Sequence, residues 1–286
     1  MSGQRRTLVY TLMAFGFAFL YGPIVVLIVY SFNASELVAV WGGFSTRWYA
    51  ALLADEQILG AAWISLRIAF TTACLATMLG TLAGLVMARF GRFRGRTLFS
   101  GLISAPLVMP DVIIGLSLLL LFVSLDQWIG WPGGRSMDTI TIAHVTFCMA
   151  YVAVIVQARL TGLDESVEEA ALDLGARPGR VFLTVTLPMI APALVAGWLL
   201  SFTLSLDDLV IASFVSGPAS STLPMVVFSK VRLGVSPKIN ALATILVLLA
   251  TVSILLAAWG MHRQERRRTR AAARVDSRET EGEGIG

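Results

Sequence analysis

Long runs of apolar residues dominate this chain and constrain its fold more than any other feature. A helix needs about 20 apolar residues to cross the hydrocarbon core of a bilayer, and several runs here reach that length. Hydrophobic residues make up 56% of the 286 residues, and only 14% are charged. Soluble domains carry about 25% charged residues. With a mean hydropathy of +0.78, the sequence predicts an all-α polytopic membrane protein.

We expect six transmembrane helices. A short segment, residues 1–6, precedes the first helix at residues 7–32, which is too long and too bulky at its end for a cleaved signal peptide. Residues 33–61 form an external loop, whose Trp and Tyr side chains suit a short helix at the membrane surface. A transmembrane core of residues 62–260 holds the other five spans, expected at residues 62–88, 98–124, 139–158, 190–215 and 241–260.

Two further segments do not fit a simple span. Residues 216–238 mix polar and apolar side chains, and we expect a re-entrant or interfacial helix around residues 223–233. Residues 261–286 are charged and lack periodicity, which predicts a disordered tail.

The distribution of Lys and Arg predicts the orientation. With the N-terminus inside, sixteen of the 22 basic residues fall in the inner segments. The positive-inside rule therefore places both termini and residues 164–188 on the cytoplasmic side. The net charge of +4 mostly reflects these arginines, so it does not indicate a nucleic-acid partner.

Residues 164–188 form a charged segment, punctuated by Gly and Pro, between two apolar runs. Ser166 and Glu169 have the spacing of a capping box, which satisfies free N–H groups at a helix start. Gly175 can adopt the left-handed conformation that ends a short helix. Pro178 suits the first turn of a second short helix, and we expect Pro188 to end it. The segment therefore predicts a helix–turn–helix elbow outside the lipid.

The elbow resembles the EAA loop in the permeases of binding-protein-dependent ABC importers. The resemblance is carried by Glu169-Ala170-Ala171, then Gly175, then Leu187-Pro188. In that family the loop is cytoplasmic and docks into a cleft of the ATPase subunit, so these residues are expected to couple the chain to an ATPase. Val185 stands where the family usually has Ile, a small apolar change. The triplet alone would also fit an ordinary helical hairpin between two spans, but the added Gly and Leu-Pro favour the loop.

Three other stretches are similar to the polyamine permeases of this family, the putrescine and spermidine importers, and most of all to the putrescine importer. They are Tyr30-Ser31-Phe32-Asn33 with Trp41 and Trp48-Tyr49, then Pro106-Leu107-Val108-Met109-Pro110-Asp111, and then Ser205-Leu206-Asp207-Asp208-Leu209-Val210-Ile211. The similarity covers nearly the whole chain except the tail. Iron and thiamine importers share similar pieces, so another substrate is the alternative.

The resemblance implies a type I ABC importer permease fold in the bacterial inner membrane. Such a permease, surrounded by membrane lipid, pairs with a second homologous permease subunit. Two ATPase subunits lie below the pair, and a periplasmic substrate-binding protein docks above. The chain itself would bind no cofactor, because the partner ATPase uses ATP and Mg. The sequence contains no G-x-x-x-x-G-K-[ST] phosphate loop, so we expect a transport subunit and not an enzyme.

Three acidic residues, Asp111, Asp207 and Asp208, lie within apolar runs. A charge near the bilayer centre costs at least about 3 kcal/mol, so it normally faces a cavity or a partner. On a helix Asp208 shares a stripe with Ser201 and Ser205. Such polar stripes suggest a water-lined path, whose carboxylates would attract a diammonium substrate.

A structural explanation of the same acids remains open. Arg67 lies near the outer end of the second span and is a possible ion-pair partner for Asp207 or Asp208. Asp111 is better explained as the cap of a helix break made by Pro110.

The remaining polar residues indicate no catalytic or metal site. His144 lies in an apolar run and is expected to pack or hydrogen-bond to a neighbour, since the only other histidine is in the tail. Cys74 and Cys148 lie in separate runs without a disulfide pattern. The arginines of residues 89–96 suit an inside anchor, with an added salt bridge to the ATPase possible.

Two rival functions are weaker. A stand-alone secondary carrier would show internal repeats over more spans and paired broken helices. An intramembrane enzyme would need a motif such as HExxH or GxSxG, and neither is present.

Overall fold

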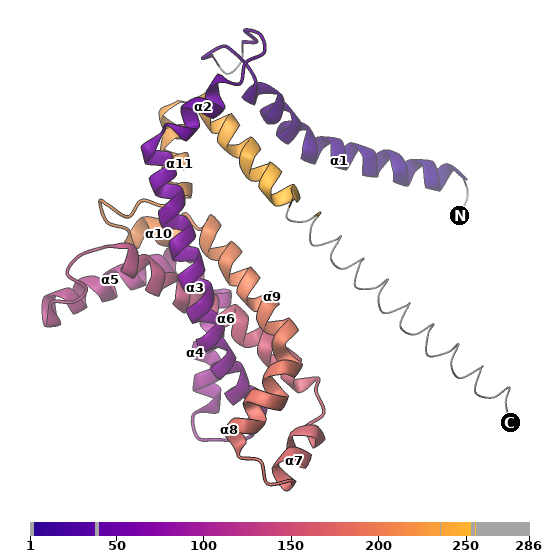
Figure 1. The fold of residues 1–286 in the computed structure, drawn as a ribbon, viewed down its shortest axis with the longest axis vertical. Helices are drawn as coiled ribbons and strands as arrows, with labels where there is room; N and C mark the ends of the chain where they lie inside the picture. Colours follow the sequence, from indigo (N-terminus) through magenta and orange to yellow (C-terminus); the bar gives the residue numbers. More distant parts are fainter. Residues whose placement is uncertain (1–2, 38–39, 235, 253–254, 256–286) are drawn as a thin grey trace, which may run out of the picture. The chain divides into compact units, whose positions relative to one another are not determined.

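The computed structural model describes residues 3–37, 40–234, 236–252 and 255, and their regular structure is almost entirely helical. Within these residues, one isolated antiparallel bridge between Asn33 and Phe44 is the only pairing of extended backbone. The all-α prediction is therefore confirmed. The elements in chain order (Figure 1) are α1 (Gly3–Ser31), α2 (Arg47–Leu53), α3 (Glu56–Arg89), α4 (Arg96–Val108), α5 (Asp111–Ile129), α6 (Met137–Thr161), α7 (Ser166–Asp173), α8 (Pro178–Val181), the π-helix η1 (Phe182–Thr186), α9 (Leu187–Asp207), α10 (Val210–Val215) and α11 (Leu223–Leu233).

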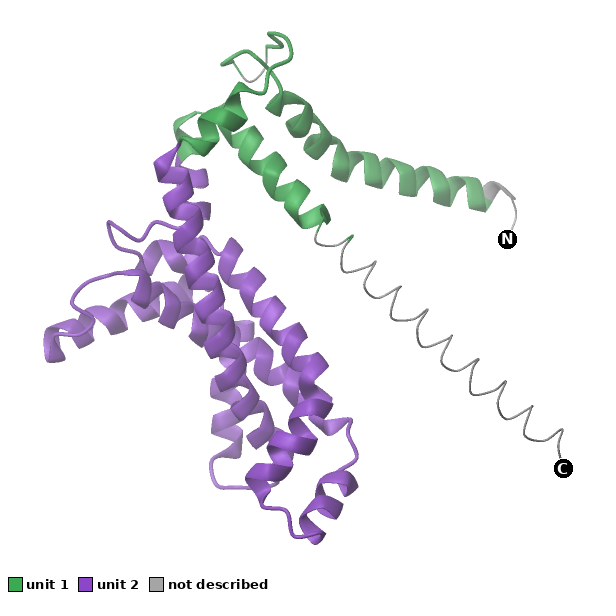
Figure 2. Ribbon diagram, viewed as in Figure 1, with its two compact units in different colours: residues 1–54, 230–286 green, residues 55–229 purple. Residues whose placement is uncertain are grey.

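The chain divides into two compact units, which Figure 2 distinguishes by colour. One unit is residues 55–229, and it contains the elbow and the three intramembrane acids. The other combines residues 1–54 with residues 230–286, and α11 crosses the boundary between the two.

Helices α3, α6 and α9 pack side by side and form the centre of residues 55–229 (Figure 1). Small residues on one face of α3 allow the backbones to approach closely. A Cβ atom on Gly80 would lie 2.6 Å from the Cβ of Val152, and one on Gly84 would lie 2.8 Å from the Ala153 carbonyl oxygen. Because lipid is as apolar as the helix surfaces, such close van der Waals packing supplies the association.

The third apolar run is broken and does not form the single helix expected over residues 98–124. Helix α4 ends at Val108, Met109 is extended with φ −76° and ψ 137°, and α5 begins at Asp111. Pro110 is the reason, because a proline disfavours helical backbone in the residue before it. The Pro110 carbonyl then accepts the amides of Ile113 and Ile114 in the new helix.

The fifth run is also broken, although one span was expected over residues 190–215. Helix α9 ends at Asp207, Asp208 is extended with φ −65° and ψ 126°, and α10 starts at Val210. Asp208 Oδ2 accepts the Ala212 amide at 2.7 Å, so the carboxylate takes up a free donor at the start of α10. Because no proline marks this break, the hydrophobic pattern does not predict it.

In the other unit, the loop after α1 is built around Asn33, which is fully buried. Its Oδ1 accepts the amides of Ser35 and Gly42, its Nδ2 donates to the Val40 carbonyl, and its own carbonyl accepts Trp48 Nε1 at 2.7 Å. The predicted short helix in this loop is confirmed as α2. The helix expected around residues 223–233 is likewise present, as α11.

Among the described residues, five helices are long and apolar enough to cross a membrane: Arg5–Ser31, Glu56–Arg89, Asp111–Ile129, Met137–Thr161 and Pro178–Asp207. Two shorter apolar helices are Arg96–Val108 and Pro237–Val252. The helix at Pro237–Val252 covers part of the sixth expected span. The predicted tail, residues 261–286, lies outside the described residues.

Candidate functional site

The elbow begins with α7, whose end is shaped by Gly175. This glycine has φ +83° and its amide donates to the Leu172 carbonyl at 2.8 Å. The Ala176 amide reaches back to the Ala171 carbonyl at 3.2 Å. These two bonds form a Schellman motif, which needs a left-handed residue in the Gly175 position. The predicted left-handed turn is confirmed.

The predicted capping box at the start of α7 is wrong. Ser166 is the first helical residue, and no side chain caps the helix. Instead, Asp164 Oδ1 accepts the Ser166 amide at 3.0 Å, as in an Asx turn. The Ser166 amide and hydroxyl hold the pKa of the Asp164 carboxyl below its usual value. The turn therefore keeps this acceptor until the pH falls through that lowered pKa.

The second half of the elbow begins as predicted but does not stop at Pro188. Pro178 occupies the first turn of α8, where its missing N–H group costs nothing. The chain then continues through η1 into α9, and Leu187-Pro188 forms the first residues of that span. The wider π-turn shifts the bonding pattern, so that the Leu187 amide bonds to the Phe182 carbonyl. This local change of register accommodates Pro188 without ending the helix.

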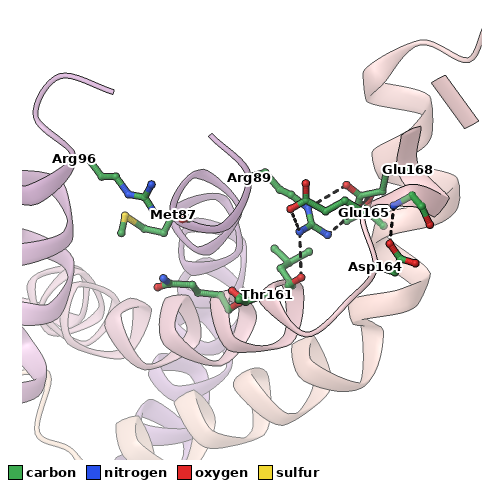
Figure 3. A network of polar contacts seen from close by, with 11 residues as sticks. Met87, Arg89, Arg96, Thr161, Asp164, Glu165 and Glu168 are labelled. Carbon is green, nitrogen blue, oxygen red and sulfur yellow. Dashed lines mark hydrogen bonds and ion pairs between the residues drawn. The ribbon is translucent and has the colours of Figure 1, made fainter. Parts of the chain in front are cut away.

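A cluster of polar contacts, the Arg89 cluster, joins the elbow to the neighbouring helix ends (Figure 3). The Arg89 side chain donates to Glu168 through Nε at 3.1 Å and Nη2 at 3.3 Å. Its Nη1 donates to Glu165 Oε1 at 2.8 Å and to the Leu160 carbonyl at 3.1 Å. The Thr186 hydroxyl donates to Glu168 Oε1 at 2.9 Å. One guanidinium thus connects the ends of α3 and α6 with α7 and, through Glu168, with η1.

The opposite side of α7 is open. Glu169 and Ala170 are exposed, Leu174 is 90% exposed, and α7 has no buried residue. The expected coupling residues Glu169, Ala170 and Gly175 are therefore all accessible on the elbow. Ala171 and Leu187 are half-buried, and Pro188 is exposed at the start of α9.

The Arg89 cluster was not anticipated from the sequence. Arg89 was expected to be an inside anchor, yet its side chain is only 12% exposed and bonds within the chain. The EAA pattern gives no role to Glu165, Glu168 and Thr186, which lie outside it. The sequence shows only arginines at residues 89–96 and acids at residues 164–173, two segments far apart in the chain. That signal does not say which acid meets which arginine.

The three intramembrane acids have different surroundings. His144 is 1% exposed, its Nδ1 lies 2.7 Å from Ser205 Oγ, and its Nε2 lies 3.2 Å from Asp208 Oδ2. The prediction that His144 hydrogen-bonds to a neighbour is confirmed. Asp207 and Asp111 are exposed on the single chain.

The alternative in which Arg67 pairs with Asp207 or Asp208 receives no support. In the described part of the chain, no ion pair links Arg67 to either acid, and Asp208 contacts His144. The break places Ser205 and Asp208 on either side of a helix end, but His144 still brings them together. Asp111 lies in the first turn of α5, directly after the break at Pro110. Its carboxylate there suits the positive end of a helix dipole.

Comparison with known proteins identifies the family. The model of the family described as binding-protein-dependent transport system inner membrane component matches residues 80–270. The chain belongs to this family. The matched range contains the elbow, Arg89 and the Asp207-Asp208 pair.

Three relatives are named for their transport systems. The putrescine transport system permease protein PotI of Escherichia coli is 58% identical over 264 residues, covering 92% of this chain and 94% of that protein. The spermidine/putrescine transport system permease protein PotC of Escherichia coli is 43% identical over 239 residues, covering 84% and 88%. The molybdenum transport system permease protein ModB of Haemophilus influenzae is 30% identical over 215 residues, covering 71% and 93%.

Solved structures share the fold at low identity. A bacterial ABC transporter involved in the import of the polysaccharide alginate aligns with a TM-score of 0.70 and 17% identity, covering 91% of this chain and 96% of that chain. The MetNI methionine ABC transporter, in an inward-facing form, aligns with a TM-score of 0.57 and 15% identity, covering 70% and 92%. The predicted importer-permease fold is confirmed, and the chain is a multi-pass inner-membrane protein.

Proposed function

We propose that this chain is the permease subunit of an ATP-driven importer that carries a polyamine, with putrescine as the preferred substrate. The observation that carries the proposal is the 58% identity to the PotI putrescine permease over nearly the whole of both chains. The 43% identity to PotC, a spermidine/putrescine permease, supports a polyamine in general and makes spermidine the second candidate. Molybdenum is a weaker alternative, because the molybdenum relative is only 30% identical. Iron and thiamine are also weaker alternatives, because they rest only on shared pieces of sequence.

In this proposal the exposed side of the elbow docks with an ATPase subunit on the cytoplasmic side. Leu174 is 90% exposed on this segment, so a docking partner can reach it. A second homologous permease, two ATPase subunits and a periplasmic binding protein complete the assembly. ATP and Mg belong to the ATPase subunits, and this chain acts as a transport subunit without catalysis of its own.

The same proposal gives the intramembrane acids a role in the pathway. Asp207 and Asp111 are exposed on the single chain, and each lies beside a break in a span. Asp208 is less accessible and contacts His144, so its part is to shape the break that Asp207 adjoins. Carboxylates at such breaks would attract a dication that has lost part of its water shell.

Reconstitution tests the proposal directly. The complete complex is placed in proteoliposomes with its binding protein, and uptake of labelled putrescine is measured with internal ATP. We expect ATP-dependent uptake of putrescine, weaker uptake of spermidine, and none of ferric iron, thiamine or molybdate. Uptake of one of these last three without putrescine uptake would overturn the substrate assignment. Uptake by this chain alone, without an ATPase, would overturn the importer assignment.

A further inference from the structure

Helix α7 has little apolar packing to hold it in place. It spans eight residues and buries none of them. Gly162 precedes it and the left-handed Gly175 follows it, so the connections on both sides are short and glycine-containing. A small helix on such connections bends easily when a partner pushes on it. Something other than apolar contact must keep it aligned with the spans.

The Arg89 cluster is the group of contacts that meets this need. Arg89 ends α3, the Leu160 carbonyl lies at the end of α6, and Glu165 and Glu168 flank the start of α7. The Thr186 hydroxyl on Glu168 adds the helix that continues into α9. Leu160, Glu165 and Glu168 all accept from this one guanidinium at 3.3 Å or less. Thr186 joins the cluster through Glu168, at 2.9 Å.

Arg89 and Glu168 form a well-oriented, partly buried ion pair, unlike a mobile ion pair on an exposed surface. Two nitrogens of Arg89 face the two oxygens of Glu168, and the side chains are only 12% and 17% exposed. A planar guanidinium makes this side-on fork, and a lysine ammonium cannot reproduce it. Partial burial also protects the pair from screening by salt.

Neighbouring glutamates thereby face different surroundings. Glu168 turns inward to Arg89 and Thr186, whereas Glu169 is exposed. One acid holds the elbow to its own chain, and the next is free for a partner.

We propose that Arg89 is a positioning residue for energy coupling. It fixes α7 to the ends of α3, α6 and η1, so that a displacement of the elbow moves the spans instead of being lost in local bending. This inference rests on the proposed function, because it assumes that an ATPase acts on the elbow. It assigns a role to residues that lie outside the EAA pattern.

The test uses the complete complex in proteoliposomes and compares three variants of this chain. Arg89→Met removes the charge and the fork, and Arg89→Lys keeps the charge but loses the fork. Arg6→Met is the control, because it removes an exposed arginine from α1. Assembly is measured by co-purification of the ATPase subunits and by the melting temperature of the complex. Coupling is measured as ATP hydrolysed per putrescine imported.

We expect both Arg89 variants to assemble and to need about fivefold or more ATP per putrescine imported, at the lower end of typical coupling effects. Glu168→Gln is expected to act in the same direction, and Arg89→Met/Glu168→Gln is expected to be no worse than either single change. Arg6→Met should match the wild type. A purely structural role would change assembly or melting but would leave the ratio of hydrolysis to import unaltered.

Two outcomes would overturn the inference. One is a wild-type ratio in assembled Arg89 variants. The other is a failure of both Arg89 variants and of Glu168→Gln to assemble, which would make the cluster a folding element only. Failure of the proposed function is seen separately, in the wild-type complex. If that complex imports a different solute, the ratio is measured with that solute and the same outcomes apply.

Discussion

Single residues of the elbow are defined by backbone conformation as much as by side-chain chemistry. Gly175 is the clearest case, since its φ of +83° lies in the region that L side chains rarely adopt, and a Cβ added there would meet no atom within 4 Å. Its constraint is therefore conformational and not one of space. A side chain there costs about 1–2 kcal/mol in the left-handed region.

Gly175→Val should uncouple ATP hydrolysis from uptake, because the β-branched side chain opposes the turn that ends α7. We expect less putrescine imported per ATP and weaker retention of the ATPase subunits. The measurement is uptake and hydrolysis in the same proteoliposomes. Gly179→Ala is the control, because Gly179 has no positive φ and no atom within 4 Å of the added Cβ. Transport at the wild-type level in Gly175→Val would contradict the docking role of this elbow.

Asp208→Asn should cut uptake while leaving assembly and ATPase coupling intact. The carboxylate accepts the Ala212 amide at 2.7 Å and lies 3.2 Å from His144 Nε2, and an amide replaces one acceptor oxygen with a donor. The break in the fifth run then loses one hydrogen-bond acceptor. Initial rates of putrescine uptake give the measurement, with Asp138→Asn as an exposed control on α6. Unchanged uptake would contradict the proposed role of Asp208 in shaping this break for transport.

Among the elements, α3 depends most on small side chains. Its packing face against α6 leaves no space at Gly80, where a Cβ would meet both the Val152 side chain and the Met149 carbonyl oxygen at 2.8 Å or less. A backbone atom cannot move aside as a flexible side chain does. The contact between these helices is therefore sensitive to a single added methyl group.

Gly80→Ala should destabilise the protein by about 1–3 kcal/mol, the usual cost of overpacking a tight core. We expect a lower melting temperature in detergent and a lower yield of assembled complex. Gly60→Ala on the same helix is the control, because nothing lies within 4 Å of its added Cβ. Equal melting temperatures for the two variants would show that α3 and α6 do not pack closely at Gly80.

For the molecule as a whole, orientation in the membrane is the property on which coupling depends. The basic residues predict that the elbow and both termini are cytoplasmic. Within residues 55–229, the elbow lies with the end of α3 at Arg89 and the end of α6 at Leu160. The loop after α5 belongs to the opposite end of α6, where the Thr139 hydroxyl bonds to the Val215 carbonyl.

Labelling of single cysteines tests this orientation. In a chain with Cys74→Ser, Asp173→Cys on the elbow should react with a membrane-impermeant maleimide only in inside-out vesicles. Trp128→Cys, at an 87% exposed position, should react only from the periplasmic side. Buried Cys148 stays in place and is expected to remain unlabelled. Labelling of Asp173→Cys from the periplasm would overturn both the orientation and the proposed contact with an ATPase.

The features that depend on local chemistry could be predicted from the amino-acid sequence. Apolar length predicts where the spans lie but not their breaks, and Gly175 and Pro178 predict the turn and the helix start. Each of these follows from residues close together in the chain. The family resemblance through Glu169-Ala170-Ala171 also depends only on local spacing, and the comparisons confirm it.

Which polar groups meet was visible only in the folded chain. Arg89 and Glu168 are 79 residues apart, and His144 and Asp208 are 64 apart, so no local pattern connects them. The break at Asp208 and the passage of the helix through Pro188 were likewise missed. Both depend on where free backbone groups find a partner, in one case the Asp208 carboxylate and in the other a π-turn. In a low-dielectric interior a polar group without a partner is costly, and the packing of helices distant in the chain determines which partner it finds.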